Sequence, residues 1–339
     1  TPKEAVSILQ LFRYADAIDH MLMAVGTVAA LAAGTAMPLM TILFADITQA
    51  LLTYNNGDDS NNQAARNNFD HQVRKYCWYF FGLGMAMWLV SSIQKLAWNI
   101  TSERSGKRLR ELFYISILRQ NIGWFDGLST GELTTRISGD VNLVQEGTGE
   151  KFSFVLQYVT TFFTGIIIAF VKGWKLTLVV LSVLPVLVGA SALMGILLSK
   201  NASGGQDSYA EAGGVADEVL SSIKTVMAFD GMARELERYR EKILKARAAG
   251  LRKSWVLGGC MGFIMFSIYS VYALGFWYGG KLAREKEMEA ATVLNVFFSL
   301  IIGGFSLGNA APSISAVASA RGAAVKVYDI IDRESPIDS

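Results

Sequence analysis

The side chains best suited to molecular recognition in this sequence are aromatic, methionine and small polar groups inside long apolar runs. Flexible thioethers and flat rings suit a pocket that accepts many apolar shapes, and ring faces attract organic cations without a fixed charge. Ordinary helix packing or lipid contact explains each single residue equally well. The set comprises Met37, Met40, Phe44, Met261, Phe263, Met265, Phe266, Tyr269, Tyr272, Phe276, Phe297, Phe298, Phe305 and Ser306.

The sequence shows no phosphate-binding loop and no histidine spacing typical of a metal site. A phosphate-binding loop of the GxxxxGK[ST] type needs Ser or Thr after its Gly-Lys pair. The Gly-Lys pairs at 106–107 and 280–281 are followed by Arg108 and Leu282 instead. The two histidines lie far apart in the sequence, so the residues predict neither a catalytic group nor a metal site.

The composition indicates an integral membrane protein of long helices. Of the 339 residues, 52% are hydrophobic and only 18% are charged, against about 25% charged in soluble domains. The net charge of +2 gives no reason to expect a nucleic-acid partner. A run of about 20 apolar residues can cross a bilayer as a helix. We expect six spans, at residues 21–52, 77–94, 152–171, 176–200, 255–280 and 290–320.

The positions of lysine and arginine predict the orientation. These residues gather between spans 2 and 3 and between spans 4 and 5, so we expect both segments and both termini in the cytosol. Before the first span, residues 1–20 contain an amphipathic stretch from Val6 to Tyr14. This stretch predicts a helix that lies on the membrane surface, with a frayed cytosolic helix as the alternative.

The spans hold almost no charge, since Asp46 and Lys95 lie near predicted span ends. Carriers driven by protons or sodium usually place an acidic side chain or a broken helix inside the membrane. We therefore expect the energy for any transport to be supplied outside the membrane.

The helices are expected to extend well beyond the bilayer. Residues 69–120 as one helix would be about 75 Å long, against about 30 Å of hydrocarbon. The tip of this helix is a turn at Gln120–Asp126, the first turn, and a second turn lies at Phe229–Leu236. In the first turn, Ile122, Trp124 and Phe125 form an apolar cluster. The cluster either docks onto a partner surface or folds back onto its own helices.

Several stretches, in order along the chain, resemble one known family. The chain resembles the transmembrane domain of B-subfamily ATP-binding-cassette exporters, the P-glycoprotein-like multidrug transporters, from about residue 5 to Asp332. The stretches are QNIGWFD, STGELTTRISGDVNLVQEGTGEK, VKGWKLTLVVLSVLPVL, ADEVLSSIKTVMAFDGMARELERY, YALGFWYGG and VFFSLIIGGFSLGNAAPSISAVASARGAA.

This resemblance implies an all-α membrane fold, the type IV exporter domain of six long transmembrane helices, with helices 4 and 5 swapped into a second half. Residues 1–20 would be an interfacial elbow helix, residues 21–330 the transmembrane domain, and residues 331–339 the start of a linker. The sequence stops at Ser339 before any Walker A segment. We therefore expect ATP and Mg²⁺ to bind in a nucleotide-binding domain that this sequence does not contain.

The resemblance also implies roles for individual residues. The two turns would dock onto nucleotide-binding domains, through Ile122, Trp124, Phe125 and Asp126 in the first turn and Phe229, Asp230 and Leu236 in the second. The drug cavity of the family is lined by residues that match Met40, Phe44, Tyr269, Tyr272, Phe276, Phe298, Phe305 and Asn309.

The function implied is the membrane half of an ATP-driven exporter, which moves amphipathic xenobiotics outward from the inner leaflet or cytosol by alternating access. The full-length protein would hydrolyse ATP, and the plasma membrane is the expected location. One set of six spans suggests a half-transporter homodimer, and the first half of a four-domain chain is the alternative. Peptide or lipid export by the same fold and a non-transporting membrane scaffold also remain open.

Small residues on span 1 suggest an outer gate in such an exporter. Gly26, Ala30 and Gly34 lie on one helical face, where small side chains let two helices approach closely. Gly34 also precedes a bend expected at Pro38. A tight contact of this kind can close the extracellular side without a strong bond. The alternative is that Gly34 faces lipid.

Overall fold

The structure is a computed structural model that describes residues 6–56, 63–126, 139–183, 185 and 210–333. These residues form helices, turns and short connections, and no strand occurs among them. The chain divides into two compact units: residues 1–177 with 279–339, and residues 178–278.

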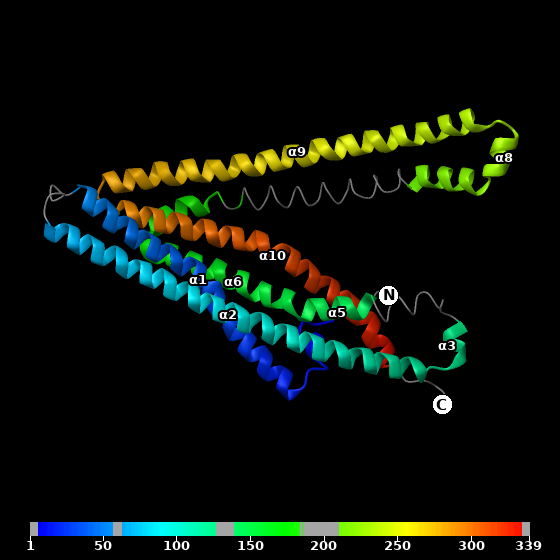
Figure 1. Ribbon diagram of the computed structural model, residues 1–339, viewed down its shortest axis with the longest axis horizontal. Helices are drawn as coiled ribbons and strands as arrows, with labels where there is room; N and C mark the ends of the chain where they lie inside the picture. Colours follow the sequence, from blue (N-terminus) through cyan, green and yellow to red (C-terminus); the bar gives the residue numbers. More distant parts are fainter. Residues whose placement is uncertain (1–5, 57–62, 127–138, 184, 186–209, 334–339) are drawn as a thin grey trace. The chain divides into compact units, whose positions relative to one another are not determined.

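Among the described residues, five helices are long and apolar enough to cross a membrane (Figure 1). They are α1 (Ala17–Asn56), α2 (Gln63–Leu118), α6 (Glu150–Leu181), α9 (Met232–Arg284) and α10 (Ala290–Ile331). The prediction of six spans therefore fits only roughly, because most of the fourth, 176–200, lies outside the described residues.

The helix α6 contains the whole of predicted span 3, 152–171, and the beginning of predicted span 4. Its backbone is not helical at Gly173, where φ is −166° and ψ is 76°. This break falls in the short connection expected between the two spans. The connection is held on one side by an ion pair between Lys175 and Glu287, with 2.6 Å between Nζ and Oε2.

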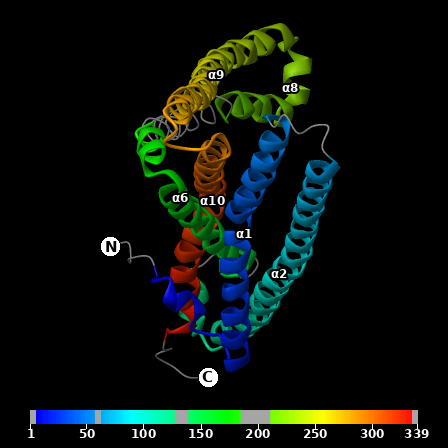
Figure 2. The same ribbon diagram turned by 90° about the vertical axis from the view of Figure 1, so that its left-hand side faces the viewer.

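Within the first unit, α1 lies between α2 and α10 (Figure 2). Small side chains make this close packing possible, since Ala30 and Ala33 are fully buried. A Cβ atom at Gly26 would stand 2.6 Å from Cδ1 of Trp98 on α2, and one at Gly34 would stand 2.6 Å from the backbone oxygen of Gln157 on α6. The small face of α1 is therefore in contact with two neighbouring helices.

A second packed region, the basal core, lies where α2 and α10 end. It includes residues from the short 3-10 helix η1 (Leu9–Phe12) and from α5 (Val141–Thr148). The helix α2 contributes Leu109, Phe113 and Ile117, which share one helical face because they are four residues apart. The basal core comprises Leu11, Leu109, Phe113, Ile117, Val141, Val144, Ala323, Ala324, Val327, Tyr328 and Ile330.

Among the described residues, the N-terminal segment is helical over a shorter stretch than the amphipathic Val6–Tyr14. The four residues of η1 form a 3-10 helix there, and α1 begins at Ala17. The interfacial elbow helix at residues 1–20 stays a prediction. The backbone N–H of Asp16 donates to the Asp19 carboxylate over 3.0 Å, as in a capping box, and this bond starts α1 earlier than hydropathy alone suggests.

In the second unit, α8 (Ile223–Ala228) leads through a tight turn into α9 (Figure 1). The N–H of Gly231 donates to the carbonyl of Val226 over 2.9 Å, and Asp230 adopts a positive φ of 49°. Aspartate tolerates this left-handed conformation better than most residues. Ion pairs from Arg238 to Glu218 and from Lys242 to Glu211 join the two arms of the hairpin, at 2.8 and 2.9 Å.

Candidate functional site

The candidate substrate residues of the first unit lie on α1 and α10. Met40 and Phe44 are one helical turn apart on α1, and both are partly exposed. The ring of Phe44 meets the ring of Phe298 edge to face, with 5.8 Å between centroids and an angle of 88°. Phe305 and Asn309 follow Phe298 at helical spacing and are exposed. The structure thus brings Phe44 and Phe298 together and leaves apolar surface beside them.

The remaining candidates belong to the second unit. Tyr269, Tyr272 and Phe276 follow one face of α9, and their successive ring centroids are 6.4 Å apart in both pairs. Tyr269 is 71% exposed, so an aromatic surface is available along this helix. The candidate cavity residues are therefore divided between two units, and each row offers ring faces to an apolar or cationic molecule.

No side chain with a fixed charge was predicted for either aromatic row, so recognition there would depend on apolar area and ring faces. Within the described ranges, no group of three or more His, Cys, Asp or Glu side chains is arranged to hold a metal ion.

The first turn combines a partly buried and an exposed apolar residue. The side chain of Asn121 caps α3 (Ile122–Asp126) by accepting from the N–H of Trp124 over 3.2 Å. Trp124 packs against the basal core, and the guanidinium of Arg333 lies 5.8 Å from its ring centroid. Ile122, in contrast, is 81% exposed. Trp124 therefore folds back, as one of the two interpretations held, and Ile122 points outward.

Two further residues predicted for the first turn, Phe125 and Asp126, lie on α3, but their side chains are outside the described part of the structure. Their docking role stays a prediction.

The second turn exposes all of its apolar residues. Phe229 is 83% exposed and Leu236 is 67% exposed, while Asp230 supplies the left-handed bend between α8 and α9. None of the residues of α8 is buried. This turn therefore presents apolar surface that its own unit does not cover, which is typical of a docking element.

The residues proposed for an outer gate are buried. Ala30 has no exposed surface, and Gly26 and Gly34 contact α2 and α6 as described above. Gly34 therefore packs against another helix of its own unit rather than facing lipid. By contrast, a Cβ atom at Gly304 or Gly308 on α10 would meet no described atom within 4 Å. The gate itself stays a prediction.

Sequence reasoning missed a buried polar cluster between α1 and α10. The hydroxyl of Thr41 lies 2.7 Å from the Ser299 hydroxyl and 3.0 Å from Oδ1 of Asn295, and all three residues are buried. Buried polar groups need partners, so this cluster fixes the register of the two helices. These three polar residues lie inside otherwise apolar spans, and that pattern could have predicted a buried polar contact between the two helices.

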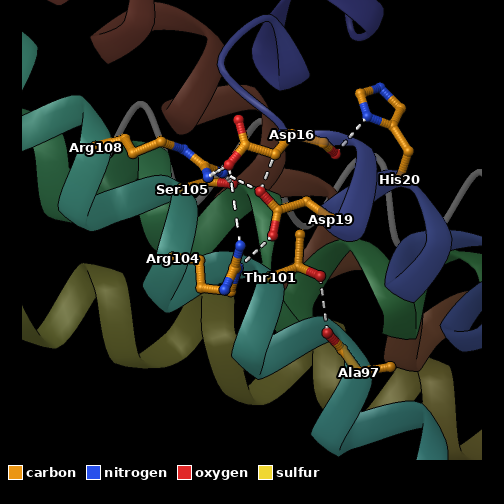
Figure 3. A network of polar contacts seen from close by, with 8 residues as sticks. All are labelled: Asp16, Asp19, His20, Ala97, Thr101, Arg104, Ser105 and Arg108. Atoms are coloured by element: carbon orange, nitrogen blue, oxygen red, sulfur yellow. Dashed lines mark hydrogen bonds and ion pairs between the residues drawn. The ribbon is translucent and has the colours of Figure 1, made fainter.

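Sequence reasoning also missed an ionic network at the start of α1 (Figure 3). Asp19 is fully buried, and its carboxylate accepts from Nε of Arg104 over 2.8 Å and from Arg108. Arg108 also pairs with Asp16. The signal was two acidic residues three positions apart before an apolar run, together with two arginines at a spacing of four on α2.

Comparison with known proteins identifies the chain's family. The model of the family described as the ABC transporter transmembrane region matches residues 23–305. The chain is 38% identical to ABC transporter B family member 2 of Dictyostelium discoideum, over 98% of this chain and 24% of that protein. It is 36% identical to human ATP-binding cassette sub-family B member 5, over 99% of this chain and 27% of that protein.

A third relative is the ABC multidrug transporter MDR1 of Cryptococcus neoformans, which is 37% identical over 98% of this chain and 25% of its own length. The chain thus spans about a quarter of the length of these relatives. Because the family model covers most of the chain and all three relatives align with nearly all of it, the chain belongs to the ABC transporter transmembrane-region family and resembles its B-subfamily members.

Proposed function

We propose that this chain is the membrane half of an ATP-driven exporter that moves amphipathic compounds outward by alternating access. The observation that carries the proposal is a pair of helices, α2 and α9, that are longer than a bilayer is thick and adjoin turns with exposed apolar residues, Ile122 in the first turn and Phe229 in the second. The helix α2 has 56 residues, or about 84 Å, against about 30 Å of hydrocarbon. Such tips suit the transmission of force from an ATP-hydrolysing domain.

The proposed substrate class follows from the aromatic rows on α1, α10 and α9. Ring faces and methionine bind apolar and cationic molecules without a fixed countercharge, so molecules of many shapes can be accepted. A relative whose name includes the word multidrug supports this class. Substrates would enter from the inner leaflet or cytosol of the plasma membrane, with both termini of the chain cytosolic.

The proposed partners are a nucleotide-binding domain, which binds ATP and Mg²⁺, and a second transmembrane half. The relatives are about four times as long as this chain. That length favours the first half of a four-domain transporter over the half-transporter homodimer that one set of six spans suggests. In either arrangement, the second turn would dock onto the nucleotide-binding domain opposite, if helices 4 and 5 are exchanged between the halves.

The proposal is tested with the full-length protein in inside-out proteoliposomes. We expect ATP-dependent uptake of hydrophobic organic cations, and no uptake with a non-hydrolysable ATP analogue as the control. A fluorescent phospholipid and an apolar peptide are assayed in parallel. Uptake of the phospholipid or peptide alone would overturn the proposed substrate class, and no ATP-dependent uptake of any probe would overturn the exporter function.

A further inference from the structure

The elbow segment, residues 6–16, connects the start of α1 to the end of α10, although these regions are distant in the sequence. Its role is not explained by lying on a membrane surface alone, because both of its ends make specific polar contacts. These contacts tie it to α2 on one side and to α10 on the other.

The end of the segment next to α1 is fixed on α2. Asp16 and Asp19 bind Arg104 and Arg108 of α2, and Asp19 is fully buried (Figure 3). A buried carboxylate that is paired with two guanidinium groups is held in one position, since a charge without a partner is costly inside a protein. This end therefore follows any movement of α2.

The middle of the segment is fixed on the last turns of α10. Arg13 forms a bidentate pair with Asp332, with 2.7 Å from Nη1 to Oδ2 and 2.6 Å from Nη2 to Oδ1. The hydroxyl of Tyr328 donates to the carbonyl of Leu11 over 3.1 Å. Nε of Arg321 donates to the carbonyl of Val6 over 2.7 Å. Two positions of α10, Arg321 and Tyr328, and its C-cap Asp332 are thus bound to one short segment.

Aromatic rings set the direction of the Arg13 side chain. Its guanidinium lies 5.1 Å from the ring centroid of Tyr14 and 6.0 Å from that of Tyr328. The two rings pack edge to face, with 5.5 Å between centroids. Bidentate binding to Asp332 raises the pKa of Arg13, and burial raises the pKa of the Tyr14 hydroxyl. Arg13 therefore stays charged and Tyr14 stays neutral at physiological pH.

The first turn adds a further contact between α2 and the end of α10. It follows α2 directly, and its Trp124 contacts both the basal core and Arg333, the residue after Asp332. Beside the direct packing of the two helices in the basal core, α2 and the end of α10 are thus connected through the elbow segment and through Trp124.

We propose that the elbow segment is a strut that makes the first turn and the end of α10 move as one body, with Arg13 as a positioning residue. The inference rests on the proposed exporter function, in which the chain after α10 leads to the ATP-hydrolysing domain. When the ATP-hydrolysing domain closes, the elbow segment makes α2 and α10 move together. Without the Arg13–Asp332 pair, less drug is transported for each ATP hydrolysed.

The Arg13–Asp332 ion pair is too exposed to act mainly by stabilising the fold. The Arg13 and Asp332 side chains are 46% and 45% exposed, and exposed ion pairs add little to folding stability. The buried contacts of Leu11 and Tyr328 keep the segment folded against α10 without the pair, so the pair affects how rigidly the segment is held. We therefore expect removal of the pair to loosen the segment and to leave the fold intact.

The functional test uses the full-length transporter with Arg13→Asp, Asp332→Arg and the two changes combined. We expect each single change to lower the amount of drug transported per ATP about fivefold, with unchanged drug affinity and melting temperature, and the combined swap to restore most of it. Lys107→Glu is the matched control, because it breaks an exposed pair within one helix, Lys107–Glu111. An unchanged ratio in both single variants, or no restoration by the swap, would overturn the proposal.

A second measurement does not depend on transport. Nitroxide labels at Ile122→Cys and Lys326→Cys, in a background with Cys77 and Cys260 replaced by serine, report the distance between the first turn and α10. We expect one narrow distance distribution in the parent, a broad one in Arg13→Asp, and a narrow one in the swap. Equal widths in all three would overturn the strut even if the protein exports drugs. If the distribution is narrow in the parent, broad in Arg13→Asp and narrow in the swap, but the protein transports nothing, the result would support the strut and contradict only the exporter function.

Discussion

The two turns differ in how much of their apolar surface their own unit covers. In the first turn, Trp124 packs on the basal core and only Ile122 is described as strongly exposed. In the second turn, Phe229 and Leu236 are both exposed, and α8 has no buried residue. The position of the first turn is therefore set by its own chain, whereas the second turn needs a partner to cover it.

The same contrast applies within the membrane. The small face of α1 at Gly34 is filled by α6, while the face of α10 at Gly304 meets no described atom. Surfaces that the unit fills itself contribute to its stability, and open surfaces are available for substrate or for a second half.

The largest difference is expected between Phe113→Ala and Phe229→Ala. The Phe113 ring is fully buried in the basal core, so its removal leaves a cavity and costs about 3–5 kcal/mol of stability. Phe229 is exposed, and its removal changes stability by less than about 0.5 kcal/mol. Thermal denaturation midpoints of the purified full-length protein measure both. Equal losses in the two variants would contradict the contrast.

The second difference concerns Gly34→Val and Gly304→Val. A side chain at Gly34 meets the backbone of Gln157, which cannot move away cheaply, so we expect a loss of about 1–3 kcal/mol. At Gly304 the added side chain enters open space, and the loss is close to zero. Thermal denaturation midpoints compare the two variants. A larger loss of stability in Gly304→Val than in Gly34→Val would show that the face of α10 at Gly304 is packed and the face of α1 at Gly34 is not.

The Gly34→Val variant also tests the outer gate. If the tight packing of α1 closes the extracellular side, the larger side chain of Gly34→Val should push the helices apart. Disulfide cross-linking between cysteine pairs placed across the outer ends of α1 and α10 should then change. Cross-linking that matches the parent would rule out a gate at Gly34. Normal membrane insertion serves as the control, since valine suits a bilayer.

The third difference concerns coupling by the two turns. Phe229→Ala removes the exposed ring of the second turn, and we expect drug-stimulated ATP hydrolysis to fall about tenfold, equivalent to about 1.4 kcal/mol of docking free energy. Ile122→Ala should lower it about threefold, because Trp124 still holds the first turn in place. Drug binding should be unchanged in both. Stimulation at the parental level in Phe229→Ala would show that this turn does not dock.

The sequence predicted the regular parts of this fold well. Hydropathy located the five spans that the described residues contain, and the connection expected between spans 3 and 4 coincides with the helix break at Gly173. It did not predict the pairing of Arg13 with Asp332, which are 319 positions apart, because no local pattern relates such distant residues. The direction of Trp124 was left open for the same reason: an apolar cluster in a turn looks alike whether it packs inward or docks.

The smallest effects are expected in the aromatic rows. Phe298 contacts Phe44 in its own unit, whereas Tyr272 belongs to the row on α9. Replacing either with alanine should change drug affinities by about two- to tenfold, since a ring contact contributes about 0.5–1.5 kcal/mol, and the changes should differ between chemically different compounds. Equilibrium binding of a drug panel measures this. A uniform change for every compound would instead indicate a packing role.

Amide hydrogen exchange of the full-length transporter in lipid nanodiscs, with and without trapped ATP, tests the contrast between the turns most directly. The account predicts that residues 109–118, which lead into the first turn, are equally protected in both states. Residues 226–236 should gain protection when ATP closes the nucleotide-binding domains. Strong protection of residues 226–236 without ATP, or a nucleotide-dependent change confined to residues 109–118, would contradict it.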